Sequence, residues 1–95
     1  PAVVKKRQLS QTTLAVVDIL KMLLKIQSAE HDVASKIIAN AADLEEIAYD
    51  DNADVPALQG WRKEIFGDDA LAIKHGKLAI GMKDGKITKF SIADL

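Results

Sequence analysis

The sequence predicts a mainly α-helical protein, a small bundle of four to five helices that ends in a β-hairpin. Two patterns predict this class. Apolar residues recur at helical spacing through most of the chain, whereas near its end they alternate with polar residues on both sides of Asp84-Gly85. A length of 95 residues allows one folded unit with its own core, and a second domain does not fit.

The first and longest helix is predicted to begin at about Gln11. Ser10 precedes it and can cap it, because the serine hydroxyl accepts an unpaired backbone N–H of the first turn. The polar stripe of this helix is narrow and consists of Gln11, Asp18, Lys21, Lys25 and Ser28. Most of the remaining positions are apolar, so we expect this helix to lie in the middle of the domain.

Two shorter helices are predicted next. Residues 33–38 form one or two turns, with Asp32 as their cap. Asn40 and Asp43 then form a capping signature, and apolar residues at helical spacing continue to Tyr49. The sequence therefore predicts a third helix that ends near Tyr49.

Two further helices are predicted within residues 56–76. Pro56 suits the first position of a helix, because that position needs no N–H. This helix continues past Gly60, an interior weak point, until Gly67 stops it. Asp68 caps the last helix, and alternating residues beyond it predict the hairpin.

The chain divides into a basic lead-in at residues 1–9, a helical bundle at residues 10–76 and a hairpin tail at residues 77–95. It contains no cysteine, which suits a reducing cytosol and leaves the fold to packing alone. No apolar stretch approaches the roughly 20 residues that a membrane span needs. No initiator methionine precedes Pro1, so we expect a fragment of a longer protein.

The formal net charge of -1 conceals an uneven distribution of charge. Residues 1–29 hold five bases and one acid, and residues 60–90 hold seven bases and four acids. Residues 30–54, by contrast, hold eight acids and one base. If these blocks fold onto different faces, the surface is dipolar and one face attracts phosphate.

Acidic residues at two places resemble metal sites but have simpler roles. Asp43 and Glu45 have the spacing of paired carboxylates that hold two metal ions in exonucleases. They fall on the first turn of a predicted helix, where acids stabilise the helix dipole, so we interpret them as capping residues. Residues 50–54 copy the opening of a calcium loop, but Val55 replaces its turn glycine. We predict no catalytic residue, metal or cofactor in this chain.

Five residues are candidates for binding nucleic acid: Lys21, Lys25, Trp61, Arg62 and Lys63. Lysines four residues apart on an exposed helical stripe can bind backbone phosphates with release of counterions. An aromatic ring beside two bases can stack on a splayed-out base while the bases hold its phosphates. Two alternatives stay open, namely a core position for Trp61 and an ordinary solvated surface for the bases.

Four segments carry a resemblance to a known family: Leu9-Ser10 with the long helix, residues 33–39, residues 42–45 and, above all, residues 60–71. From Leu9 to about Ile80 the chain resembles the C-terminal part of ribonuclease D, in the form found in alphaproteobacteria. The last segment is similar to the HRDC module, a small helical bundle shared by RecQ-type helicases and ribonuclease D. Its recurring positions correspond here to Gly60, Phe66-Gly67 and Leu71.

This resemblance implies a function for the chain. The parent protein is expected to be a cytoplasmic, metal-dependent 3′–5′ exoribonuclease that acts on tRNA precursors. Its catalytic carboxylates and divalent metals are expected in an upstream exonuclease domain, so this part is a non-catalytic accessory domain. The implied partners are tRNA-like RNA and the exonuclease domain of the same chain, with no membrane.

The acidic block at residues 30–54 favours an alternative function. A surface rich in carboxylates repels RNA, and the overall charge of the chain is modest. The alternative is a structural or protein-docking helical domain without direct RNA contact.

Overall fold

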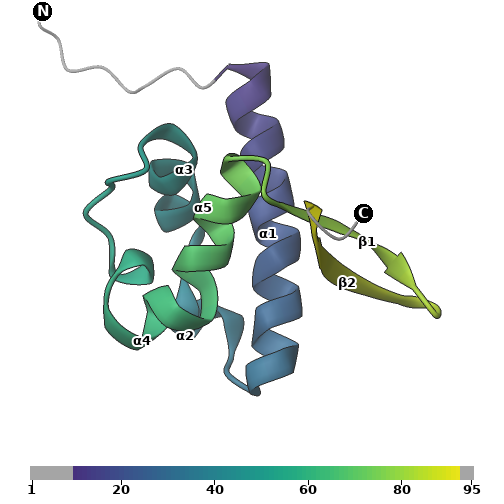
Figure 1. Ribbon diagram of the computed structural model, residues 1–95. Coiled ribbons are helices and arrows are strands. Elements are labelled where there is room, and N and C mark those ends of the chain that lie inside the picture. Colours follow the sequence, from purple (N-terminus) through teal and green to yellow (C-terminus); the bar gives the residue numbers. More distant parts are fainter. Residues whose placement is uncertain (1–9, 93–95) are drawn as a thin grey trace, which may run out of the picture.

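Figure 1 shows a computed structural model of the chain, which describes residues 10–92. The basic lead-in predicted for residues 1–9 and the end of the predicted tail at residues 93–95 lie outside the described residues. The described part is mainly α-helical and ends in a two-stranded antiparallel hairpin, as the sequence predicts. The long helix α1 (Gln11–His31) lies between the other helices and the hairpin (Figure 1).

Helix α1 begins where the sequence predicts. The Ser10 hydroxyl accepts a hydrogen bond of 3.1 Å from the Thr13 backbone N–H, which satisfies one unpaired donor of the first turn. The inner face of α1 buries Leu20 completely. The outer face is less polar than the predicted stripe, because Leu14 and Met22 are 43% and 38% exposed. Within residues 10–92, no helix combines the length and the apolar character needed to cross a membrane.

The turn after α1 differs from the prediction. Asp32 has a φ of 55° and forms the left-handed C-cap of α1, a conformation that its short polar side chain tolerates. Asp32 therefore ends α1, and the prediction that it caps the next helix is wrong. The turn is closed by a hydrogen bond from the Ser28 hydroxyl to the Val33 carbonyl, and α2 (Ser35–Ile38) follows without a side-chain cap.

The predicted capping signature of the third helix is confirmed. The Asn40 side chain accepts a hydrogen bond of 2.8 Å from the Asp43 backbone N–H, and the Asp43 carboxylate accepts one of 3.2 Å from the Asn40 backbone N–H. Two otherwise unpaired donors of α3 (Ala41–Tyr49) are thereby satisfied. Leu44 and Ile47 of this helix are buried against α1.

Pro56 begins a single 3₁₀ turn, η1 (Pro56–Leu58), and not a long helix. The backbone is extended at Gln59 and has a φ of 57° at Gly60, a value that glycine adopts without strain. The helix predicted from Ala57 to Phe66 is therefore wrong in its first turn. Gly60 is not an interior weak point of this helix but the residue at which it begins.

Residues 60–74 form one continuous helical rod, made of α4 (Gly60–Arg62), the π-helical η2 (Lys63–Gly67) and α5 (Asp68–Lys74). The predicted stop at Gly67 and the predicted cap at Asp68 are wrong, because both residues have right-handed helical angles. Position 67 instead requires glycine because there is no room for a side chain. A Cβ atom at this position would lie 2.7 Å from the Ala57 carbonyl oxygen, which is closer than atoms approach.

The core lies between α1, α3 and the helical rod, and its largest buried apolar residues are Phe66, Leu20, Leu23, Ile38, Leu44 and Ile47. Burial of one such side chain contributes about 1.5–3 kcal/mol. Gln27 of α1 is also buried, at 2% exposure, which the apolar pattern does not predict. Its amide donates to the Ile65 carbonyl and so joins α1 to η2, while its Oε1 atom finds no partner within the described residues.

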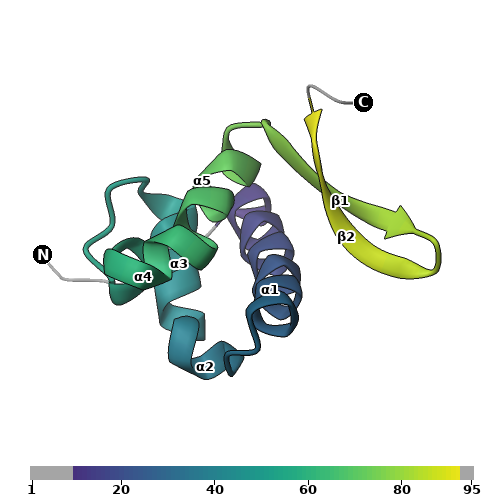
Figure 2. The same ribbon diagram turned by 60° about the horizontal axis from the view of Figure 1, so that its bottom comes forward.

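Strands β1 (Leu78–Lys83) and β2 (Lys86–Ser91) form the predicted hairpin, with Asp84-Gly85 as its two-residue turn. Both turn residues have positive φ angles, 53° and 78°, as a type I′ turn requires. Ile80 of β1 packs against the helical core. The hairpin therefore docks along α1, as Figure 2 also shows from a second direction.

Candidate nucleic-acid interface

Lys21 and Lys25 lie on the outer face of α1. They are four residues apart, so they share one side of the helix, and both are exposed. Neither forms an ion pair within residues 10–92. Their ammonium groups are therefore available to an external anion, although Asp18 lies one turn away on the same helix.

The hairpin adds Lys83 and Lys86, which sequence reasoning did not select. These two lysines stand directly opposite each other beside the turn, and both are exposed. Like Lys21, they form no ion pair in the described part of the chain. The signal was present in the sequence, because lysines that flank a two-residue Asp-Gly turn must face each other across the hairpin.

A groove between α1 and the hairpin brings three of these lysines together, Lys25, Lys83 and Lys86. Its volume is about 610 Å³. Met22 from α1 and Ile87 from β2 supply apolar surface between the lysines. The groove therefore combines positive charge with exposed apolar side chains.

Trp61 lies outside the core, at 44% exposure, so the core alternative for this residue is wrong. The Arg62 guanidinium lies over its ring, with 4.5 Å between the guanidinium carbon and the ring centroid. A hydrogen bond of 2.8 Å from Arg62 Nε to the Ile37 carbonyl holds the guanidinium in place. The side chains of Trp61 and Arg62 thus form an ordered aromatic and basic pair on the surface.

The ammonium group of Lys63 is less available to an external anion than the guanidinium of Arg62. Its ammonium group forms an ion pair of 2.5 Å with the Asp68 carboxylate, one turn along the helical rod. Both side chains are about half exposed, so water screens the pair and it contributes little to stability. The positive charge of Lys63 is nevertheless partly neutralised inside the fold.

The five sequence-predicted residues fall on two surfaces. Figures 1 and 2 place α4 and the hairpin at opposite ends of the structure, with α5 and α1 between them. Lys21 and Lys25 belong to α1, and Lys25 lines the groove beside the hairpin, whereas Trp61, Arg62 and Lys63 belong to the start of the helical rod. The structure does not bring the two groups together.

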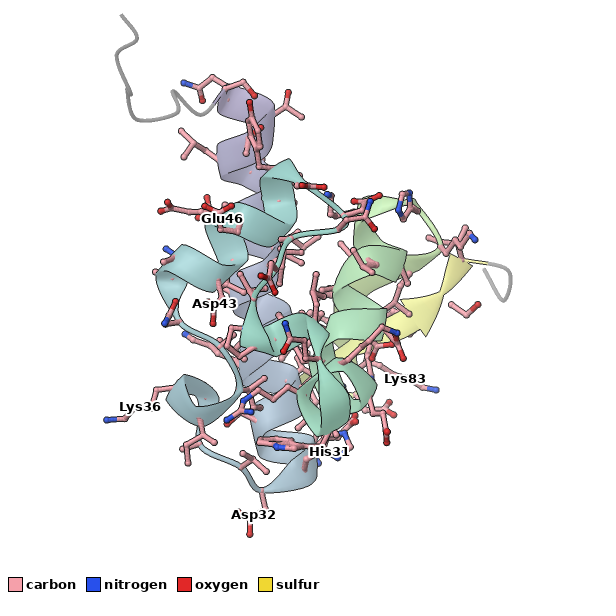
Figure 3. The ribbon with its side chains drawn as sticks, turned by 90° about the vertical axis from the view of Figure 1, so that its left-hand side faces the viewer. His31, Asp32, Lys36, Asp43, Glu46 and Lys83 are labelled. Atoms are coloured by element: carbon pink, nitrogen blue, oxygen red, sulfur yellow. The ribbon has the colours of Figure 1, made fainter. Side chains whose placement is uncertain are left out.

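Acidic side chains gather on α3 and on the turn that follows it. Figure 3 shows Asp43 and Glu46 on α3, on the opposite side of the view from Lys83 in the hairpin. Three more acids, Asp50, Asp51 and Asp54, follow in the next turn. Asp43 and Glu46 thus lie on a different side from Lys83, whereas Glu30, from the same acidic block, lines a pocket together with Lys83. The separation of charge that the sequence predicts is therefore only partial.

Asp51 joins the turn after α3 to the end of α5. Its carboxylate accepts a hydrogen bond from Lys74 Nζ and lies 2.7 Å from His75 Nε2. Lys74 Nζ also donates to the Ile47 carbonyl in α3, at 2.7 Å. The hydrogen bond from Lys74, together with the positive charge of Lys74 and of protonated His75, lowers the pKa of Asp51. Lys74 therefore serves the fold and not an external ligand.

The acids that resembled metal sites have roles in local structure. Asp43 belongs to the capping box of α3. In the turn after α3, the Asn52 backbone N–H donates to the Asp50 carboxylate at 2.9 Å, so Asp50 stabilises the turn. Among residues 10–92, no three metal-ligating side chains lie close enough to hold an ion.

Comparison with known proteins places the chain among ribonucleases D, although no family model and no solved structure matches it. It is 55% identical over 75 residues to ribonuclease D of Nitrobacter hamburgensis, a match that covers 79% of this chain and 20% of that protein. Ribonuclease D of Granulibacter bethesdensis is 43% identical over 90 residues, which cover 94% of this chain and 22% of that protein. Ribonuclease D of Bartonella henselae is 44% identical over 88 residues, which cover 92% of this chain and 22% of that protein.

The extent of these matches defines what the chain corresponds to. It spans about a fifth of the length of the curated relatives it matches. The matches nevertheless cover most of its own residues, with identities well above those of unrelated proteins. The resemblance carried by residues 33–39, 42–45 and 60–71 is thus confirmed, and the chain belongs to the ribonuclease D family as its C-terminal domain.

Proposed function

We propose that this chain is an RNA-binding accessory domain of a cytoplasmic 3′–5′ exoribonuclease. The observation that supports this best is a set of exposed lysines without ion pairs in the described residues, on the side of α1 and the hairpin: Lys21, Lys25, Lys83 and Lys86. Binding of phosphates by such lysines releases counterions, which drives association with RNA. Catalysis, with its divalent metals, belongs in this proposal to the remainder of the parent protein.

Trp61 and Arg62 supply a second RNA contact in this proposal. An exposed tryptophan can stack on an unpaired base, and the neighbouring guanidinium can hold a phosphate. The hydrogen bond from Arg62 to the Ile37 carbonyl preorganises this pair. Because Asp68 already neutralises Lys63, we expect Lys63 to contribute less than Arg62.

The test is RNA binding by the 95-residue chain and its variant Lys21→Ala/Lys25→Ala, with a tRNA transcript as the probe. Removal of two phosphate contacts should weaken affinity and reduce the slope of log K against log salt by up to about 2. Lys36→Ala/Lys77→Ala is the matched control, because these lysines are also exposed but belong neither to α1 nor to the groove. The control should bind as the wild type does.

The acidic surface of α3 and its following turn favours the second candidate function, a domain that docks other protein parts without contacting RNA. It predicts that these lysines do not bind RNA, so Lys21→Ala/Lys25→Ala leaves any weak RNA binding of the 95-residue chain unchanged. Equal affinities and equal salt slopes for the wild type and this variant would therefore favour the docking function over the RNA-binding function.

A further inference from the structure

The groove between α1 and the hairpin has an apolar wall that backbone phosphates alone do not require. Met22 and Ile87 line the groove and are 38% and 40% exposed, and Met82, which lines an adjoining hollow, is 66% exposed, although all three are large apolar side chains. A second hollow of about 420 Å³ continues the groove along α1 and shares Met22 and Ile87 with it. Ile19 of α1 lines this continuation, so the apolar surface is longer than one side chain.

The charges at the groove point to an anionic occupant. Lys83 and Lys86 lie directly opposite each other, and like charges in this arrangement destabilise a hairpin. Two acids also line the groove, Glu30 and Asp84. Glu30 is partly neutralised, because its carboxylate lies 3.6 Å from the Lys89 ammonium group. Positive charge therefore prevails at the end of the groove next to the turn.

An unpaired RNA strand has both kinds of surface that this groove fits. It presents phosphates together with the flat faces of its bases, which pack on apolar or aromatic side chains. A duplex stacks those faces inside and presents phosphates and 2′-hydroxyls instead. Apolar contacts at Met22, Met82 and Ile87 would thus add affinity for a single strand and none for a duplex.

We propose that the groove between α1 and the hairpin binds an unpaired segment of RNA, an inference that rests on the RNA-binding function proposed above. Lys25, Lys83 and Lys86 contact its phosphates, and Met82 and Ile87 contact its bases. Hydrophobic contacts do not distinguish one base edge from another, so binding in the groove tolerates different sequences.

The experiment compares two probes, a single-stranded RNA of about 12 nucleotides and the blunt duplex formed with its complement. Fluorescence anisotropy at several salt concentrations gives the affinity and the salt slope for each probe. The wild type should prefer the single strand. Lys83→Ala/Lys86→Ala should weaken single-strand binding and reduce its salt slope by about 1.4, since each phosphate contact on a single strand contributes about 0.7.

The apolar wall is tested separately with Met82→Ser. This side chain is mostly exposed, so the variant should fold, which circular dichroism verifies. It should weaken single-strand binding severalfold without a change in salt slope, because no charge is removed. Lys36→Ala/Lys77→Ala is again the matched control, and both affinities should stay at the wild-type value.

Three outcomes would overturn this inference. If Lys21→Ala/Lys25→Ala weakens RNA binding but Lys83→Ala/Lys86→Ala and Met82→Ser do not, the domain binds RNA through α1 without the hairpin, and only the groove assignment is wrong. If the hairpin variants weaken duplex and single strand equally, the groove is a general phosphate surface. If the wild type binds neither probe nor the tRNA transcript, the RNA-binding function fails together with the groove, and a protein occupant takes its place.

Discussion

Two regions of the molecule use lysine in opposite ways. In the helical body, formed by α3, η1 and the helical rod against the inner face of α1, the Lys74 side chain is 14% exposed and bonded to Asp51 and the Ile47 carbonyl. On the groove side, formed by the outer face of α1 and the hairpin, Lys25 and Lys83 are exposed and have no ion pair within residues 10–92.

This contrast separates lysines that stabilise the fold from lysines that are free to bind. A lysine ammonium group has three donors. When a carboxylate and a carbonyl already accept from it, few donors remain for a phosphate. A lysine surrounded by water can exchange that water for a phosphate and release counterions. Residue type alone does not distinguish the two, whereas the partners of each ammonium group do.

The largest expected difference between the two regions is in the free energy of unfolding of Phe66→Ala and of Met82→Ala. Phe66 is fully buried in the helical body, so its truncation should lower the free energy of unfolding by about 3–5 kcal/mol. Met82 is 66% exposed on the groove side, and its truncation should change stability by less than about 0.5 kcal/mol. Urea unfolding followed by circular dichroism measures both values. Similar losses for the two variants would contradict this division of the molecule.

Lys74→Met and Lys25→Met test the difference between the two regions with the loss of a single charge in each. Loss of the Lys74 ammonium group removes the side-chain donor to the Ile47 carbonyl and one of the two basic partners of Asp51, which should cost about 1–3 kcal/mol of stability. Lys25→Met should cost less than about 0.5 kcal/mol, because no bond within the described residues is lost. RNA affinity should show the reverse order, so both variants are measured by unfolding and by RNA binding. If Lys74→Met loses as much RNA affinity as Lys25→Met, the two lysines do not have the different roles described above.

The smallest expected effect is the response of the helical body to acid. The hydrogen bond from Lys74 holds the pKa of Asp51 below its ordinary value of 3.8, so folding favours the ionised carboxylate. This stabilisation is complete above the ordinary pKa and is lost as the pH falls through the lower pKa of the folded protein. The Asp51 side chain is 38% exposed, so solvent screening keeps the effect below about 1 kcal/mol.

The matching variant is Asp51→Asn, which cannot ionise. Its free energy of unfolding should decrease less than that of the wild type between about pH 5 and pH 2, because one proton-linked contribution is absent. Chemical unfolding at a series of pH values measures the difference. If the two curves run parallel, Asp51 does not link the fold to protonation.

The elements that sequence reasoning predicts correctly depend on neighbours in the chain. Ser10 before α1, the Asn40 and Asp43 pair before α3, and the Asp84-Gly85 turn each act within a few residues. The errors at Gly60 and Gly67 have a different origin. Gly67 looks like a helix stop, but it is determined by the Ala57 carbonyl, ten residues away, and no local rule includes that contact.

The candidate interface shows the same limit. Helical spacing correctly places Lys21 and Lys25 on an exposed face of α1. It cannot reveal that the hairpin brings Lys83 alongside Lys25, because that contact depends on how the hairpin docks. Nor can it reveal that α4, the helix that contains Trp61, lies at the opposite end of the structure from the hairpin, since three-dimensional position follows from packing between distant segments.

The type I′ turn at the hairpin tip has a consequence for how such domains diverge. Each inserted pair of residues on either side of Asp84-Gly85 would extend both strands in register, and exposed tips of this kind accept insertions readily. The hairpin contains none of the fully buried core residues, so its length can vary while the helices keep their stability. Lengthening or shortening of this ribbon is therefore a simple route by which related domains come to differ in the length of their exposed hairpin.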